Sequence, residues 1–184
     1  LLLSLLAKQN YDNNKYEIII ADDDSTDDTA ETVKEAMQSI DNLKLLSVES
    51  PAAGVSRKKN ALTQAVEKSQ GEIILATDAD CKVKPNWIAT MVKYFTDGVG
   101  MVAGLSLPQS HSPANLVQSF EFFDMLVLFT AAAGAIGAEK PFSCSGQNLA
   151  YTRKAYERVK GYEKIKNYES GDDVLLMQLI KNAG

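Results

Sequence analysis

Residues 71–81 read GEIILATDADC, in which a glycine and an apolar run lead into two aspartates separated by one residue. The run from Ile73 to Ala76 has no polar alternation, which is typical of a short strand buried on both faces. Asp78 and Asp80 follow where such a strand leaves the core. The stretch therefore predicts a central strand of an α/β sheet with two carboxylates at its end.

Two carboxylates this close repel each other unless a cation lies between them. Hard divalent cations take oxygen ligands, commonly one or two carboxylates together with phosphate oxygens. Asp78 and Asp80 are therefore candidate ligands of Mg2+ or Mn2+ in a site that holds a phosphorylated substrate. The alternative is a pair of solvated turn residues, and on this stretch alone the two interpretations are about equally supported.

The composition predicts one domain and excludes several classes of site. The 184 residues suit a single domain with a proper core, and the net charge of −5 argues against a broad nucleic-acid surface. Cys81 and Cys144 lack metal-type spacing and are expected to be free thiols in a reducing compartment. His111 is the only histidine, which excludes a multi-histidine metal site and disfavours a Ser-His-Asp triad.

The two ends of the chain predict a domain, residues 1–184, that is truncated at both ends. The opening LLLSLLAKQN has no initiator methionine, basic leader or cleavage site, and it resembles the middle of a helix. The longest apolar run, Met125 to Ala138, is shorter than the roughly 20 residues that cross a bilayer. We expect a buried helix there, with contact to a membrane or lipid acceptor as the alternative.

Strand and helix patterns alternate along the chain. Expected strands cover 16–21, 43–48, 73–78 and 99–105, and 145–151 reads as a turn and strand; expected helices cover 29–40, 56–69, 86–95, 115–133 and 171–182, with a bend or close-packed segment at 131–138. This order predicts an α/β fold with a mostly parallel sheet and helices on both faces. Right-handed crossovers bring the strand ends to one edge, where ligands bind, so the acidic strand ends should share one crevice.

The segment ADDDSTDD (21–28) is the first acidic cluster. Asp28, with Glu31 three residues later, resembles a capping box. A calcium loop is disfavoured because counting from Asp22 puts Asp27 where an EF-hand needs glycine and Val33 where it needs glutamate. One carboxylate of this cluster could instead accept a hydrogen bond from the N–H of a bound base.

The segments ESGDDVLL (169–176) and GVSRKKNAL (54–62) carry the remaining candidate groups. Asp172 and Asp173 precede a helix, where they either cap it or act as a general base towards an acceptor hydroxyl. The basic triplet 57–59 begins another helix, and one of its members could neutralise a diphosphate. The alternative for each of the three is a solvated basic face.

In combination, five motifs resemble the family 2 nucleotide-sugar glycosyltransferases of GT-A fold. The stretch ending in ADDDSTDDT is similar to the family's DDGS-type motif, GVSRKKNAL to its GK-type segment and ATDAD to its DxD motif. SGQNLAYTRKAYERVKGY is similar to the SG-x-x-x-A-x-R segment, and GDDVLLMQLIKNAG to the ED-type base motif with its helix. The motifs occur in the family's order and cover nearly the whole chain.

The resemblance implies a role for each matching residue. Asp22 and Asp23 are expected to bind the nucleotide base, and Lys58 the diphosphate, although Arg57 and Lys59 are alternatives. These roles extend to the other motifs: Asp78 at the ribose or diphosphate, Asp80 on the metal, Asp173 as general base and Asp172 as its neighbour. The implied reaction is a metal-dependent, inverting transfer from a UDP-sugar to a hydroxyl of a glycan, such as a cell-envelope polysaccharide, or of a lipid.

Departures from the family pattern are local. Asp24 stands where the family has glycine or another small residue, Asp172 replaces the usual glutamate, and the family's first strand is absent. Two other functions remain: a non-catalytic nucleotide-sugar binding module, and a sugar-1-phosphate nucleotidyltransferase, whose glycine-rich N-terminal loop is not seen. The resemblance also implies the cytoplasmic face of a membrane-anchored full-length protein, with membrane segments outside this chain and no nucleic-acid partner.

Overall fold

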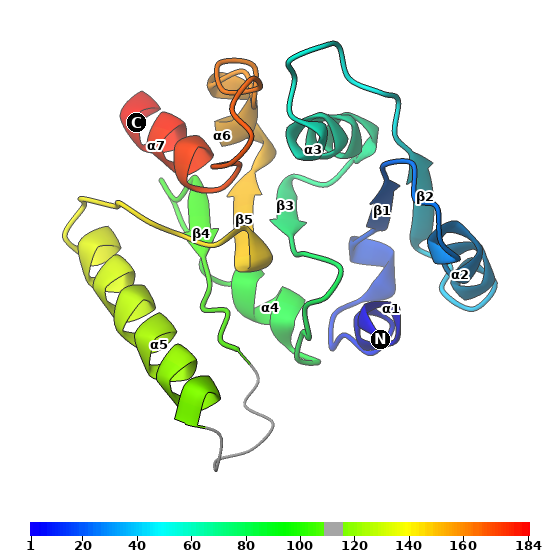
Figure 1. The fold of residues 1–184 in the computed structure, drawn as a ribbon, viewed down its shortest axis with the longest axis horizontal. Helices are drawn as coiled ribbons and strands as arrows, with labels where there is room; N and C mark the ends of the chain where they lie inside the picture. Colours follow the sequence, from blue (N-terminus) through cyan, green and yellow to red (C-terminus); the bar gives the residue numbers. More distant parts are fainter. Residues whose placement is uncertain (109–115) are drawn as a thin grey trace.

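The computed structural model describes residues 1–108 and 116–184, and His111 lies outside them. The elements in order are α1 (Leu2–Leu6), η1 (Asn13–Lys15), β1 (Ile18–Asp22), α2 (Thr29–Met37), β2 (Leu43–Ser47), α3 (Arg57–Lys68), β3 (Ile73–Ala76), α4 (Trp87–Val92), β4 (Met101–Ala103), α5 (Leu116–Gly137), η2 (Gly146–Asn148), β5 (Leu149–Thr152), α6 (Arg153–Arg158) and α7 (Val174–Ala183) (Figure 1). The predicted α/β alternation is therefore confirmed.

The strands form two hydrogen-bonded groups. β1 and β2 pair in parallel, with Ile18 opposite Leu43. β3 and β4 both pair antiparallel with β5, which lies between them, so β3 and β4 are parallel to each other. The antiparallel β5 departs from a strictly parallel sheet, because apolar periodicity identifies a strand but carries no information on its direction.

Each group of strands has its own apolar core. One core surrounds β5, where Tyr151 is fully buried and stacks on Tyr156 with ring centroids 5.4 Å apart. Leu176 of α7 is also fully buried in this core. The second core joins α1, β1, α2 and β2 through Leu6, Val33 and other apolar side chains. The two cores fix the strand ends that carry the acidic residues.

The helix that follows β1 begins differently from the predicted capping box. Asp28 occupies the N-cap position of α2 but makes no side-chain capping bond. Asp27 instead accepts hydrogen bonds from the backbone N–H of Thr29 at 3.1 Å and from the Thr29 hydroxyl at 2.6 Å. The acidic turn therefore stabilises the helix start through the neighbouring carboxylate.

Three expectations about the apolar segment near residue 130 are wrong. α5 runs without a bend through the small-residue stretch, because alanine has the highest helix propensity and tolerates the two glycines at 134 and 137. The helix is also not buried: Ala132 is its only buried residue, whereas Leu116 is 83% exposed and Phe120 72% exposed. Its 22 residues are long and apolar enough to cross a membrane by length and composition, so the expected limit on length fails too.

Candidate functional site

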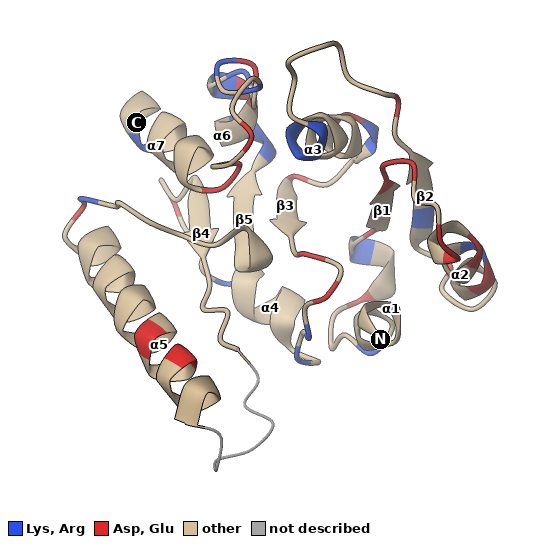
Figure 2. Ribbon diagram, viewed as in Figure 1, with Lys and Arg blue, Asp and Glu red and all other residues tan. Residues whose placement is uncertain are grey.

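The predicted acidic and basic groups converge at the start of α3. The Nζ atom of Lys58 lies 3.3 Å from Oδ1 of Asp78, which follows β3, and 3.1 Å from Oδ2 of Asp172, which precedes α7. Figure 2 shows basic residues on α3 and acidic residues in the loops that follow β1 and β3. The three motifs around these residues span more than a hundred residues of sequence, from Lys58 to Asp172, and they meet at one ammonium group.

The charges around Lys58 favour its protonated form. Partial burial alone would lower its pKa, but the hydrogen bond and charge of Asp172, together with Asp78, raise the pKa of the ammonium above its usual value. The side chain of Lys58 is 49% exposed, whereas that of Asp172 is only 14% exposed. A positive charge thus faces solvent between two carboxylates, in a position to meet an anionic ligand.

The three consecutive basic residues 57–59 contact different partners, so Arg57 and Lys59 do not share the contacts of Lys58. Arg57 donates from Nε to Oδ2 of Asp23 at 2.8 Å and from Nη2 to the Asp23 carbonyl at 2.8 Å. This hydrogen bond to Asp23 raises the pKa of the Arg57 guanidinium. The Asp23 carboxylate, predicted to accept from a base, therefore already has an arginine partner.

Lys59 is buried, with 1% of its surface exposed. Its Nζ atom donates to the carbonyls of Tyr168 at 2.6 Å and Ser170 at 2.9 Å. Burial lowers the pKa of this ammonium, although nearby acidic side chains oppose the change. The backbone N–H of Ser56 binds the Lys166 carbonyl at 2.8 Å, so α3 holds three alternate carbonyls of the segment that leads to Asp172.

Asp173 is held by backbone amides on two sides. Its Oδ1 accepts from the N–H of Val174 at 2.6 Å at the start of α7, and its Oδ2 accepts from the N–H of Gly146 at 2.9 Å. The capping role that competed with catalysis is therefore present. A carboxylate has about four acceptor positions, so capping leaves capacity for an acceptor hydroxyl.

Asp80 takes no part in the ion pairs of Lys58. It is exposed, and Sγ of Cys81 lies 3.9 Å from its Oδ1 atom. Among the residues that the structure describes, no group of three or more His, Cys, Asp or Glu side chains is arranged to hold a metal ion. The buried hydroxyl of Thr77, next to Asp78, has no hydrogen-bond partner in the described chain. Two carboxylates and an unpartnered hydroxyl fit a cation that draws its other oxygens from a bound phosphate.

The loop after β1 has the backbone conformation that favours glycine. Asp24 has a φ of 63°, in the left-handed region where asparagine and aspartate are tolerated better than other non-glycine residues. Oδ1 of Asp22 accepts from the N–H of Ser25 at 3.1 Å and so closes the turn. Asp24, which stands where the family has glycine or another small residue, therefore keeps the geometry of this turn. Asp22 has a structural role in the same turn.

The two cysteines are free, and their environments predict opposite reactivity. Burial, assisted by the negative charges of Asp173 and Asp172, raises the pKa of the Cys144 thiol to about 12. We expect N-ethylmaleimide at pH 8 to modify Cys81 alone in the folded protein, because the thiolate is the reactive form. Mass spectrometry of the intact protein should show one adduct, and a second only after unfolding. Two adducts on the folded protein would contradict the burial of Cys144.

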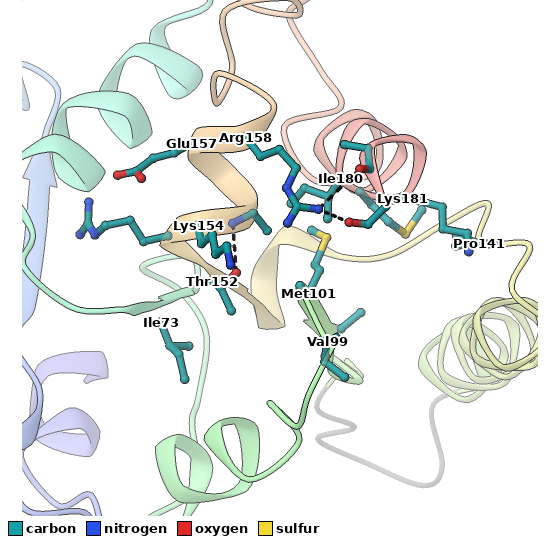
Figure 3. A pocket seen from close by; sticks show the side chains of 18 of the residues that line it. Ile73, Val99, Met101, Pro141, Thr152, Lys154, Glu157, Arg158, Ile180 and Lys181 are labelled. Carbon is teal, nitrogen blue, oxygen red and sulfur yellow. Dashed lines mark hydrogen bonds between the residues drawn. The ribbon is translucent and has the colours of Figure 1, made fainter.

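A cavity of about 1080 Å3 lies at the other end of β3 (Figure 3). It is lined by Ile73, the first residue of β3, and by Met101, Thr152, Ile180 and Lys181. Asp78 follows the opposite end of β3 and does not line this cavity. The converging charges are therefore a site separate from this cavity.

The fold and the positions of the motifs define a GT-A glycosyltransferase domain. Residues 1–160 match the description of glycosyl transferase family 2, and the chain belongs to that family. The mannosyltransferase PcManGT from Pyrobaculum calidifontis, solved with GDP-Man and Mn2+, superposes with a TM-score of 0.72 and 24% identity over 97% of this chain and 46% of that one. TarS of Staphylococcus aureus gives a TM-score of 0.62 and 18% identity over 99% of this chain and 30% of that one.

Curated relatives match parts of the chain. A beta-monoglucosyldiacylglycerol synthase of Nostoc sp. is 38% identical over 90 residues, which is 49% of this chain and 19% of the relative. Glycosyltransferase AglE of Haloferax volcanii is 28% identical over 127 residues, 67% of this chain and 40% of the relative. The chain thus spans less than half the length of the relatives it matches. The family and fold expected from the motifs are confirmed.

Proposed function

We propose that the domain transfers a sugar from a nucleotide-diphosphate donor to an acceptor hydroxyl, with inversion at the anomeric carbon. The observation that carries this proposal is the convergence of Lys58 with Asp78 and Asp172, beside the backbone-held Asp173. It gives one site a cationic group for a diphosphate and a fixed carboxylate for a hydroxyl. The family membership supports the reaction class.

The proposed step is a single displacement. The acceptor oxygen forms a bond to the anomeric carbon while the bond from that carbon to the diphosphate oxygen breaks. Asp173 takes the acceptor proton, and the electron pair leaves with the nucleoside diphosphate. The ammonium group of Lys58 offsets the negative charge of the departing diphosphate. To do so, Lys58 leaves its ion pairs with Asp78 and Asp172. The base of the donor binds near Asp22 and Asp23, after Arg57 moves or shares the Asp23 carboxylate.

Asp80 and Asp78 are the proposed ligands of Mg2+ or Mn2+. The ion would supply charge stabilisation to the leaving diphosphate. The two carboxylates are too few to hold it tightly alone, and one of them is paired with Lys58. The chain's residues therefore predict a metal that binds together with the donor.

This prediction is tested by calorimetry on the full-length protein. We expect Mn2+ alone to give little or no heat, and Mn2+ added with UDP to bind at least tenfold more tightly, because the diphosphate completes the oxygen ligands. Asp80→Asn should remove this gain, whereas Asp97→Asn, at an exposed acidic position outside the site, should keep it. Tight binding of Mn2+ without nucleotide, or an unchanged gain in Asp80→Asn, would contradict the assignment.

UDP is the proposed donor nucleotide, and a glycan or lipid hydroxyl the proposed acceptor. The first rests on family resemblance, and the second on relatives named beta-monoglucosyldiacylglycerol synthase and poly(ribitol-phosphate) beta-N-acetylglucosaminyltransferase. A thermal-shift panel of nucleoside diphosphates with Mn2+ separates the bases. We further propose that the protein works at the cytoplasmic face of a membrane.

Two other functions predict different outcomes in the same experiments. A non-catalytic nucleotide-sugar module would bind UDP with Mn2+ but form no product from any acceptor. A sugar-1-phosphate nucleotidyltransferase would release pyrophosphate from a nucleoside triphosphate and a sugar phosphate. Assaying UDP release and pyrophosphate release in parallel distinguishes the three.

A further inference from the structure

Helix α5 carries eight of the fifteen exposed large hydrophobic residues of the described chain. It runs along the outer side of the molecule beyond β4 (Figure 1), and most of its large side chains face solvent. Its exposed large hydrophobic residues are Leu116, Val117, Phe120, Phe123, Met125, Val127, Leu128 and Ile136. Isolated exposed apolar residues are ordinary, but a contiguous surface of this size marks a contact with another phase or molecule.

The apolar surface surrounds much of the helix. At about 100° per residue, the exposed hydrophobic side chains cover roughly 220° of the helix circumference. A packed protein partner or a second copy of the chain typically covers a stripe of about 100° to 120°. A hydrocarbon phase, in contrast, contacts a helix on every side that the domain leaves free. The distribution therefore favours lipid over a protein partner.

The charged groups of α5 are confined to its first half. Glu121 and Asp124 are exposed and, at about 100° per residue, lie within the same arc as the exposed apolar side chains, so this part of the helix belongs at the level of the lipid headgroups. Residues 125–138 contain no charged side chain. The hydroxyl of Thr130 donates to the Leu126 carbonyl at 2.7 Å, so this polar group is satisfied within the helix. Internal satisfaction of polar groups is the condition for placing a helix in hydrocarbon.

Two common explanations for a long apolar helix do not apply here. Only 6% of the apolar 18-residue stretch of α5 is buried, so α5 is not the core helix of a soluble domain. It lies in the middle of the chain rather than near its beginning, so it is not a secretion signal.

The sheet topology argues against a helix that crosses the bilayer. The strands before and after α5, β4 and β5, are hydrogen-bonded neighbours, with Met101 opposite Tyr151. Both ends of the helix must therefore return to the same side. Residues 138–145, which connect α5 to η2, reach at most about 29 Å when extended, short of the roughly 30 Å hydrocarbon core. An extended connection in lipid would also leave its backbone groups unsatisfied.

We propose that α5 lies in the interfacial region of one membrane leaflet and anchors the domain to the bilayer without spanning it. The contact is driven by apolar burial, because the helix carries acidic rather than basic residues and the chain has a net charge of −5. It should therefore form with zwitterionic lipid, show little dependence on salt, and gain nothing from anionic lipid. This contact is separate from the proposed sugar transfer and from membrane segments outside the chain.

The position of α5 also bears on the acceptor of the proposed sugar transfer, and this step of the inference rests on that proposed function. Residues 138–145 lead directly from α5 to Gly146, whose N–H holds Asp173. Gln178 of α7 donates to the Pro141 carbonyl at 2.8 Å and ties the same connection to the helix that follows Asp173. An acceptor hydroxyl carried by a membrane lipid would thus approach a site mechanically linked to the anchoring helix.

A local fluorescent probe tests the membrane contact in the full-length protein. In a background in which Cys81 and every cysteine outside residues 1–184 are replaced by alanine, so that the buried Cys144 is the remaining native thiol, Val127→Cys is labelled with bimane and mixed with phosphatidylcholine vesicles. Met37→Cys on α2, also an exposed apolar position, is the matched control. We expect a blue shift and quenching by doxyl-labelled lipid at residue 127 only, unchanged between low and high salt.

The probe reports on the contact whether or not the protein transfers sugar. A blue shift at residue 127 before vesicles are added would show that protein covers the helix and would overturn the proposal. No shift with vesicles would overturn it as well. Labels at Leu107→Cys and Lys140→Cys, which lie outside the helix on its two sides, should both be quenched by iodide outside sealed vesicles, whereas protection of one of them would show a spanning helix instead.

Discussion

Replacing Asp173 with asparagine is expected to lower kcat by about 10^3-fold while donor binding changes little. The carboxamide cannot take the acceptor proton, and Asp173 makes no ion pair with Lys58, the cation proposed to meet the diphosphate. In wild type, Asp173 accepts hydrogen bonds from the amides of Val174 and Gly146. Asparagine can keep only one of these with its carbonyl oxygen, so a modest loss of stability is also expected. Steady-state transfer and UDP calorimetry on the full-length protein measure the two effects.

Asp172→Asn is the matched control. Asp172 pairs with Lys58 rather than with the backbone amides, so its replacement should change donor affinity more than it slows chemistry. Thermal unfolding of both variants separates loss of the base from loss of folded protein. Unchanged turnover in Asp173→Asn, with the protein folded, would rule out Asp173 as the general base and favour its capping role alone.

Replacing Lys59 with methionine is expected to lower the free energy of unfolding by roughly 3 kcal/mol. The buried ammonium binds the carbonyls of Tyr168 and Ser170, and methionine would leave both without that donor in a site closed to water. The segment before Asp172 would lose its attachment to α3, so activity should fall together with stability. Denaturant unfolding and steady-state kinetics of the variant measure the two effects.

Lys58→Met, one residue away, should give the reverse pattern. Lys58 is half exposed, and its removal should change the free energy of unfolding by less than about 1 kcal/mol. Donor affinity should nevertheless fall by at least tenfold, because the cation facing the diphosphate is lost. Equal stabilities of the two variants would contradict the structural role of Lys59, and unchanged UDP binding in Lys58→Met would contradict the diphosphate role.

The sequence alone was sufficient for the alternation of the longer strands and helices and for the family, but it did not predict the short helix α6. Apolar runs such as 73–76 identified strands, and the aspartates at their ends predicted one shared edge, which the contacts of Lys58 with Asp78 and Asp172 are consistent with. The distribution of the basic triplet was not predictable. Consecutive residues of a helix point about 100° apart, so only the packing of α3 decides that Arg57, Lys58 and Lys59 face three different partners.

Other features depended on tertiary structure in the same way. The amino-acid composition showed that the α5 segment is apolar, but only the structure shows that its side chains are exposed on the domain. The backbone amide of Gly146 that holds Asp173 has no side chain to mark it in the sequence. The similarity of SGQNLAYTRKAYERVKGY to a family motif indicated a functional region but did not identify this backbone contact. The assignment of Asp80 as a metal ligand stays a prediction, because Asp80 takes no part in the ion pairs of the site and the described residues form no cluster of three metal-binding side chains.

The stereochemistry of the product tests the central claim most directly. The full-length protein is incubated with a UDP-sugar whose sugar is α-linked, Mn2+ and an acceptor, and the new glycosidic linkage is examined by proton NMR. A single displacement assisted by Asp173 predicts a β-linked product. An α-linked product would contradict this mechanism, because it requires two displacements or retention at the anomeric carbon.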